Sequence, residues 1–245
     1  MRFKDKVIIV TGATGGIGHA CAQQFAREGG RLILVDLAVD LADTISRDLE
    51  RLGAPKVVLA KCDVSQEAEV TGVCDMVMAA FGRLDVVVNV AGAMIYKPIK
   101  ELTGDDWRRC LDINLMGAVY FTREAFRRMT NGGAIVNVSS VHAHQTSANV
   151  APYAAAKAAL ESLTRSSAIE GKAVGIRANA VLPGAVDTPM LWASPNLKSG
   201  AEVLAPEDVG RPEHIAAAVA FLASDEAAFI TGASLLADGG RLAKL

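Results

Sequence analysis

A tyrosine and a lysine stand four residues apart near the middle of the chain, as Tyr153 and Lys157 in the stretch Y-A-A-A-K. The alanines between them favour a helix, which would place both side chains on one face, one turn apart. A nearby ammonium favours the ionised form of a phenol, whose ordinary pKa is about 10. Such a tyrosine can exchange a proton with an alcohol near neutral pH. Two unrelated surface residues of a helix would show the same spacing, so the rest of the chain must decide.

The composition is that of a globular protein with a large core. The chain has 245 residues, of which 51% are hydrophobic and 21% charged, and its formal net charge is −2. This charge leaves no broad cationic surface for nucleic acid or anionic membranes, so we expect a small-molecule ligand. The four cysteines lack metal-ligand spacing, which predicts reduced packing residues and no metal site. The first apolar run is too short for a signal peptide or a membrane span, and we expect a cytoplasmic location.

Short apolar segments alternate with longer segments of helical spacing. We expect strands over 7–10, 32–35, 57–60, 86–88, 134–138 and 176–181, and helices over 19–28, 41–52, 67–81, 107–129 and 152–170. Continuous apolar runs are typical of strands buried on both faces of a parallel sheet. The alternation predicts an α/β fold with a doubly wound sheet, and the lack of linker-like stretches favours one domain over 1–245. Only 190–211 interrupts the pattern, as an irregular lid or a surface segment.

A glycine-rich turn, T-G-A-T-G-G-I-G over 11–18, follows the first expected strand. Glycines let the backbone approach a pyrophosphate, and the next helix offers unpaired N–H groups and the positive end of its dipole. The glycine spacing differs from the G-x-G-x-x-G fingerprint, yet its place between strand and helix predicts a dinucleotide site. The residues of this turn that we expect at the cofactor are Gly12, Thr14, Gly15, Gly16, Ile17 and Gly18.

The second strand ends at Asp36, whose carboxylate can accept hydrogen bonds from the adenosine ribose and would repel a 2′-phosphate. The next residue is Leu37, and the glycine turn has no Arg or Lys, so the counter-charge for NADP is missing. We therefore predict NAD in preference to NADP; the alternative is that Asp36 only caps the following turn. Two more strand ends, C-D-V and N-V-A-G, are expected at the same sheet edge, with Asp63, Val64, Asn89, Ala91 and Gly92 at the cofactor.

Six motifs in order resemble the short-chain dehydrogenase/reductase family in its one-domain form. They are T-G-A-T-G-G-I-G, N-V-A-G, the Asn of D-I-N-L, N-V-S-S, Y-A-A-A-K and P-G-A-V-D-T, and they span nearly the whole chain. The resemblance implies a nicotinamide-dependent oxidoreductase on a seven-stranded parallel Rossmann sheet flanked by helices, usually a homotetramer. One departure is Val90, where many relatives have a second asparagine; some hydrogen bonds around the central sheet must therefore differ.

The resemblance also implies roles for particular residues. Tyr153 is the expected general acid/base, Ser140 is expected to hydrogen-bond the substrate oxygen, and Lys157 to bind the nicotinamide ribose. Asn114 matches the asparagine that holds a water in the proton relay from the lysine. The resemblance also places a loop at the nicotinamide, where spacing alone shows only a tight turn; its residues are Pro183, Gly184, Val186 and Thr188.

Substrate choice is expected in the loops 93–99 and 141–150, and from 190 onward. The polar middle loop, with His142 and His144, resembles that of sugar and polyol dehydrogenases of this family. We therefore expect a small polar secondary alcohol or its ketone, and leave open whether either histidine touches it. An alternative enzyme is a 3-oxoacyl-thioester reductase, which shares these motifs but generally uses NADPH. The alternative of another class is an NAD-binding sensor without turnover, against which the presence of all four catalytic residues argues.

Overall fold

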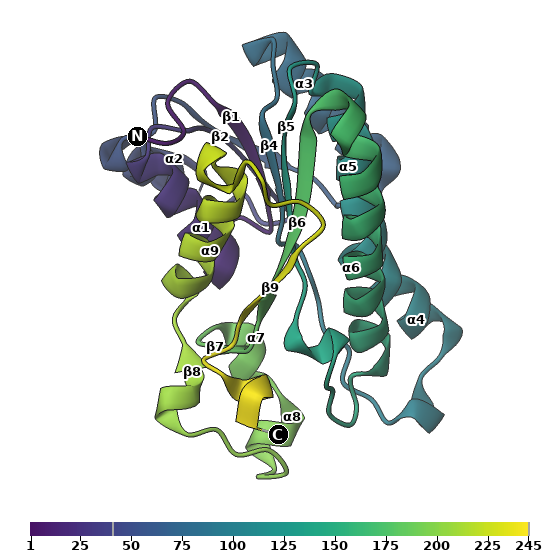
Figure 1. The fold of residues 1–245 in the computed structure, drawn as a ribbon. Coiled ribbons are helices and arrows are strands. Elements are labelled where there is room, and N and C mark those ends of the chain that lie inside the picture. Colours follow the sequence, from purple (N-terminus) through teal and green to yellow (C-terminus); the bar gives the residue numbers. More distant parts are fainter. Residues whose placement is uncertain (41, 245) are drawn as a thin grey trace.

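The structure, a computed structural model, describes residues 1–40 and 42–244. Seven strands of these residues form one parallel sheet in the order β3-β2-β1-β4-β5-β6-β9 (Figure 1). The strands are β1 Val7–Thr11, β2 Arg31–Asp36, β3 Val57–Lys61, β4 Val86–Asn89, β5 Gly133–Val138, β6 Ile176–Pro183 and β9 Ser234–Ala237. The strand order reverses between β1 and β4, as in a doubly wound fold. The predicted fold class is confirmed, and β9 is the seventh strand that the family resemblance implied.

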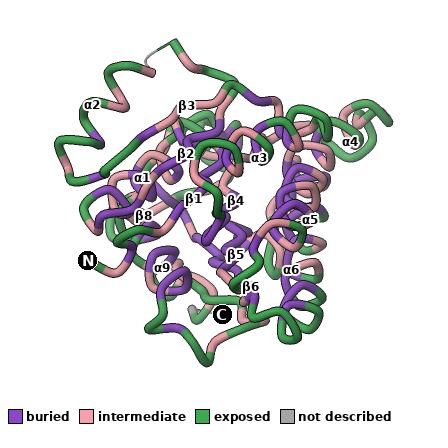
Figure 2. The backbone as a smooth tube through the Cα atoms, turned by 90° about the horizontal axis from the view of Figure 1, so that it is seen from above, coloured by how far each residue is buried: buried purple, intermediate pink, exposed green. Residues whose placement is uncertain are grey.

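Helices cover both faces of the sheet (Figures 1 and 2). On one face lie α1 Gly16–Arg27, α2 Ala42–Leu52 and α9 Pro212–Ala223; on the other lie α3 Glu67–Phe81, α5 Gly117–Arg128 and α6 Ala151–Gly171. Successive residues of β1 serve opposite faces, since Ile8 packs in the core beneath α1 and α9 and Ile9 in the core beneath α3 and α5. Burial on both faces explains the continuous apolar runs. Among the described residues, no helix combines the length and apolar character needed to cross a membrane.

The helix predicted over 107–129 is interrupted. It consists of α4 Gly104–Leu111, a π-helical turn over Asp112–Met116, and α5. Asn114 lies in the π-helical turn, and its amide nitrogen donates to the carbonyl oxygens of Cys110 at 2.9 Å and Ala93 at 2.8 Å. Apolar periodicity does not reveal one extra residue in a single turn, so the π-helical turn could not be predicted from the pattern of apolar residues.

The other predicted helices differ from the structure mainly at their ends. α1 begins at Gly16 rather than at residue 19, because the glycine turn itself forms the first helical turn. α2 begins at Ala42, and Leu41, the first residue of the predicted helix over 41–52, lies outside the described residues. Boundaries are the least reliable part of a prediction from periodicity.

The irregular segment predicted over 190–211 carries short elements. They are α7 Pro189–Trp192, α8 Pro195–Lys198 and β8 Val209–Gly210, which pairs with β7 Ala185–Val186. We call residues 189–208 the lid. Asn196 is buried in it and donates to the hydroxyl of Ser147 at 3.3 Å and to the carbonyl oxygen of Ala148 at 3.0 Å. These bonds hold the lid against the loop 141–150.

The hydrogen bonds around Val90 depend on Thr11, the last residue of β1. The backbone N–H groups of Val90 and Ala91 both donate to the Thr11 hydroxyl oxygen, each at 3.0 Å. Thr11 is 2% exposed, so water cannot readily replace it as the acceptor. One hydroxyl therefore fixes the turn that follows β4.

Replacing Thr11 by valine is expected to lower the free energy of unfolding by about 2–4 kcal/mol, because two N–H groups in a buried turn lose their acceptor. Thr11→Ser keeps the hydroxyl and loses only a methyl group, so its expected loss is about 1 kcal/mol. Urea unfolding of both variants measures the difference. Equal stability of the valine and serine variants would show that the hydroxyl does not hold this turn.

Candidate active site

A cavity of about 620 Å³ lies along the carboxyl edge of the sheet. It spans the point where the strand order reverses between β1 and β4, which is where open α/β sheets bind ligands. Its wall runs from Asp36 at the end of β2 to Tyr153 and Lys157 on α6. Of the predicted cofactor and catalytic residues, all line this cavity except Asn89 and Asn114.

The glycine turn forms a cradle at the N-terminus of α1. Gly12 adopts a φ of +61°, and a Cβ there would lie 2.9 Å from the Cα of Ala91. A Cβ on Gly18 would clash with the carbonyl oxygen of Gly12. The N-cap, Gly15, makes no side-chain capping bond, and no acidic residue occupies the first turn. The first N–H groups of α1 are thus open to an anionic ligand, and the cradle fits a dinucleotide pyrophosphate.

Asp36 is joined to the glycine turn by hydrogen bonds. Its carboxylate accepts from the backbone N–H of Thr14 at 3.0 Å and from that of Ala38 at 3.2 Å. The carboxylate therefore does cap the turn after β2, as the alternative held, and it also lines the cavity. Leu37 beside it is 59% exposed and brings no positive charge to this end of the cavity.

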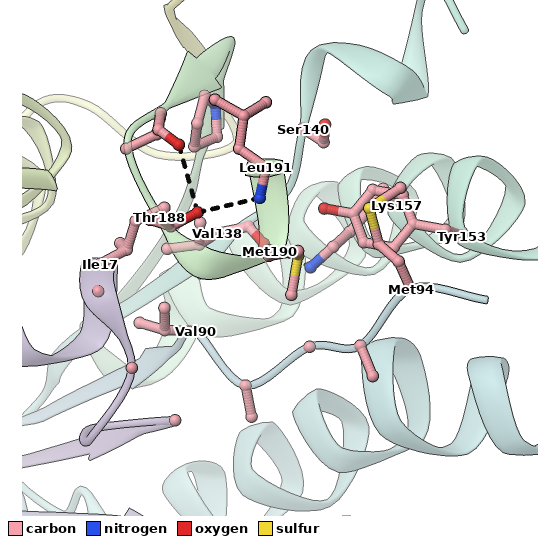
Figure 3. Close-up of a pocket in the computed structure, with 18 of the residues that line it drawn as sticks. Ile17, Val90, Met94, Val138, Ser140, Tyr153, Lys157, Thr188, Met190 and Leu191 are labelled. Atoms are coloured by element: carbon pink, nitrogen blue, oxygen red, sulfur yellow. Dashed lines mark hydrogen bonds between the residues drawn. The ribbon is translucent and has the colours of Figure 1, made fainter. Parts of the chain in front are cut away.

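The four predicted loop residues Pro183, Gly184, Val186 and Thr188 line the same cavity, and Thr188 lies against Gly16 of the glycine turn. The hydroxyl of Thr188 donates to the carbonyl oxygen of Val186 at 3.2 Å and accepts from the N–H of Leu191 at 3.4 Å (Figure 3). Thr188 thereby caps α7, the first helix of the lid. On the β3 side, Asp63 accepts from the hydroxyl of Ser65 at 2.7 Å, so it shapes the turn in which Val64 lines the cavity.

Tyr153 and Lys157 lie one turn apart on α6, as predicted, and both face the cavity (Figure 3). The Lys157 Nζ is 5.4 Å from the centroid of the Tyr153 ring and donates to the carbonyl oxygen of Val138 at 2.8 Å. The Ser140 side chain lies close enough to the Tyr153 hydroxyl to oppose the rise of its pKa. Ser139 instead donates to the carbonyl oxygen of Lys157 at 2.8 Å. The second serine is therefore the one that faces the phenol.

Burial determines the charge states of this pair. It raises the pKa of Tyr153 to about 12, against a smaller lowering effect of Ser140, and lowers the pKa of Lys157 to about 8. The structure thus does not show the lowered tyrosine pKa expected from a nearby ammonium. Both groups are almost completely buried, and desolvation disfavours the ionised form of each. Near neutral pH the phenol is protonated and can donate a hydrogen bond or a proton.

Asn89 and Asn114 lie behind the cavity wall. Asn89 is buried and donates to an asparagine side chain of β5 at 2.8 Å. Asn114 is 1% exposed, and its side-chain oxygen accepts from the N–H of Ala93 at 3.2 Å. A Cβ on Gly92 would lie 2.8 Å from this oxygen and 3.6 Å from the Lys157 Nζ, so the position that a side chain of residue 92 would take borders both asparagine and lysine. The positions of the two asparagines favour a supporting role over direct ligand contact.

The substrate end of the cavity includes residues that the sequence did not single out. They are Met94 and Tyr96 from the loop 93–99, Met190, Leu191 and Glu202 from the lid, and Arg241 near the C-terminus. The ring of His142 lines the cavity and packs edge-on against Tyr153, with centroids 6.0 Å apart. His144 instead pairs with Glu161 at 3.1 Å and does not line the cavity. The three predicted loops are present, but no motif marks Arg241, because only the folded chain brings it here.

Comparison with known proteins agrees with this geometry. The profile of a family described as enoyl-(acyl carrier protein) reductase matches residues 12–241. The cis-4-hydroxycyclohexanecarboxylate dehydrogenase of Sinomonas cyclohexanicum is 42% identical over 97% of this chain and 97% of its own. The meso-2,3-butanediol dehydrogenase of Serratia marcescens is 36% identical over 99% of this chain and 97% of its own.

A solved structure gives the same result. The crystal structure of a chain from Burkholderia xenovorans, assigned to the short-chain dehydrogenase/reductases, superimposes with a TM-score of 0.91 and 34% identity, covering 100% of this chain and 99% of that one. The likeness thus extends over sequence, fold and the whole length of the chain. The chain belongs to the short-chain dehydrogenase/reductase family, and it is an oxidoreductase that acts on CH–OH groups.

Proposed function

We propose that this protein interconverts a secondary alcohol and its ketone by hydride transfer, with NAD preferred over NADP and Tyr153 as the general acid/base. The observation that carries the proposal is one continuous cavity, with Asp36 at the end of β2 and the buried group of Ser140, Tyr153 and Lys157 in the same wall. A carboxylate at the adenosine end disfavours a 2′-phosphate, and a hydroxyl pair at the other end can hold a substrate oxygen.

The side chains of this group divide the work as follows. A nicotinamide bound between the glycine turn and the lid would accept the hydride in oxidation and supply it in reduction. Ser140 donates a hydrogen bond to the substrate oxygen, and Tyr153 takes the hydroxyl proton in oxidation and returns it in reduction. Lys157 would bind the nicotinamide ribose, and Asn114, behind Gly92, would support the lysine side of the wall. The loop from Pro183 to Thr188 would hold the carboxamide.

For the substrate we favour a small cyclic secondary alcohol over a sugar. Four apolar side chains, Met94, Val150, Met190 and Leu191, line the cavity at the substrate end, and they would pack against the methylene groups of a ring. One of the two relatives supports this choice, since it is named for a hydroxylated cyclohexane ring, whereas the other is named for an open-chain four-carbon diol. The description of the matching family keeps an acyl-thioester reductase as the second candidate, although Asp36 argues against NADPH.

We also propose that the chain is a single domain over 1–245 and acts as a homo-oligomer, a tetramer by family resemblance. Exposed apolar side chains near the edge strand β9 support contact with another copy, since Phe229 is fully exposed and Leu236 is 48% exposed.

A spectrophotometric assay of nicotinamide reduction and oxidation tests the proposal. Purified protein is assayed with NAD and NADP against cyclohexanol, cyclopentanol, 4-hydroxycyclohexanecarboxylate, 2,3-butanediol, a hydroxysteroid, sorbitol and a 3-hydroxyacyl thioester. We expect turnover of a ring alcohol with NAD. Faster turnover of the thioester with NADP would favour the acyl-thioester reductase. Binding of NAD without turnover of any substrate would favour a sensor.

A further inference from the structure

The C-terminal turn brings a cation into the substrate end of the cavity. After β9 the chain turns back over Arg241–Lys244, and Asp238 fixes this turn by accepting from the N–H groups of Gly240 and Leu242, each at 2.9 Å. Arg241 thereby lines the same cavity as Tyr153. Figure 1 shows the C-terminus beside the short lid helices.

Among the described residues, the guanidinium of Arg241 is hydrogen-bonded through only one of its nitrogens. One terminal nitrogen of its guanidinium donates to the carboxylate of Glu202, a lid residue that also lines the cavity. Within residues 1–40 and 42–244, the structure contains no other hydrogen bond of this guanidinium. A guanidinium carries five N–H donors in a planar fork, so most of its donors remain for a ligand.

The charge pair lies at the Tyr153 end of the cavity. Burial lowers the pKa of His142; Glu202 opposes this shift and Arg241 adds to it, so both charges act on a ring that packs edge-on against Tyr153. The cavity lining includes apolar side chains, Met94 and Met190 among them, and the Arg241 side chain is only 32% exposed. In such surroundings a cation interacts strongly with an anion that shares the space.

We infer that Arg241 binds a carboxylate of the substrate, so that the substrate is a secondary alcohol or ketone that also carries a carboxylic acid. The inference rests on the proposed function. A carboxylate matches the guanidinium fork by two parallel hydrogen bonds, which an alcohol or an amide cannot form equally well. Glu202 orients the guanidinium and competes with the incoming carboxylate for it.

The proposed carboxylate site can be tested with ligands that bind but do not react. Cyclohexanecarboxylate and cyclohexanecarboxamide share a ring and differ in charge, and calorimetry measures both with the intact protein, with and without NAD. We expect the acid to bind the wild type at least about tenfold more tightly than the amide. Arg241→Gln should weaken the acid about 10- to 100-fold and leave the amide within about threefold. Lys198→Gln, which removes an exposed lid cation outside the cavity wall, should change neither.

The variant Glu202→Gln distinguishes two roles of Arg241: binding of the substrate carboxylate, or holding the lid in place through its ion pair with Glu202. If Arg241 binds the substrate carboxylate, removing its competitor should tighten the acid by about threefold or more, opposite to the Arg241 variant. If the pair only fastens the lid, both variants weaken acid and amide alike, and the inference is overturned. Tighter binding of cyclohexylamine than of the acid, lost in Glu202→Gln, would instead assign the site to an ammonium group.

Kinetics connects the binding site to the reaction. With 4-hydroxycyclohexanecarboxylate and its carboxamide as substrates, Arg241→Gln should raise KM for the acid by the same factor and change kcat little. Turnover of both with no preference for the acid would leave the dehydrogenase proposal standing and overturn the carboxylate site. Preferential binding of the acid without any turnover would support the carboxylate site and overturn the dehydrogenase proposal.

Discussion

Replacing Tyr153 by phenylalanine is expected to lower kcat/KM for alcohol oxidation about 1,000-fold, within the range that a positioned acid/base contributes. The substitution removes one oxygen from a ring that is 8% exposed and packs against His142, so the apolar contacts persist. What disappears is the hydroxyl that Ser140 contacts. The assay is steady-state oxidation of a ring alcohol with NAD.

The control for this variant is cofactor binding. The glycine turn and Asp36 lie at the other end of the cavity, so Tyr153→Phe should bind NAD within about threefold of the wild type by tryptophan fluorescence. A parallel loss of NAD binding would mean that the ring positions the cofactor rather than the proton. Residual activity above about a tenth of the wild type would contradict the role of Tyr153 as the acid/base.

The pH dependence provides a second check on the same residue. Because burial raises the pKa of Tyr153 to about 12, the phenolate fraction grows throughout the range from about pH 7 to about pH 10. Oxidation by the wild type should therefore accelerate as the pH rises over that range. The phenylalanine variant should lack this slope, whereas a slope that persists would belong to another group, of which Lys157 with a pKa of about 8 is the nearest.

Local patterns of apolar residues predicted the sheet because its central strands are buried on both faces. β1 and β2 are buried on both faces, so their apolar runs are continuous and easy to recognise. The glycine turn could also be predicted, since glycines between a strand and a helix indicate a backbone conformation that other residues rarely adopt. The placement of Tyr153 and Lys157 on one face of a helix followed from their spacing, whereas their catalytic roles followed from the family resemblance. Each of these features depends on residues that are neighbours in the sequence.

Features that depend on tertiary contacts could not be predicted in this way. The π-helical turn at Asn114 exists because one side chain bonds the backbone at Ala93, on another segment. The raised pKa of Tyr153 depends on how closely the surrounding chain excludes water, which spacing does not report. Arg241 reaches the cavity only after the whole sheet has formed. A resemblance supplied the roles of Asn114 and Ser140, but it did not point to Met94, Met190 or Arg241 in the cavity wall.

The choice of cofactor should reverse when the charge at the end of β2 is reversed. The double variant Asp36→Asn/Leu37→Arg is expected to shift the ratio of kcat/KM for NAD to that for NADP by about 100- to 1,000-fold towards NADP. Unlike charges about 4 Å apart near a protein surface interact by about 4 kcal/mol, and like charges repel by as much. Leu37 is 59% exposed, so an arginine fits there without disturbing the core.

Asparagine is chosen at position 36 because the carboxylate also accepts from the N–H of Thr14 and Ala38. An alanine would leave both groups without their acceptor and would confuse a lost turn with a lost charge. Asp36→Asn alone is the matched control: it keeps an acceptor, removes the repulsion, and should raise activity with NADP while activity with NAD falls only moderately. A wild type that uses NADP as well as NAD would show that Asp36 serves the turn alone, because a carboxylate that faces the ribose cannot leave a 2′-phosphate unopposed.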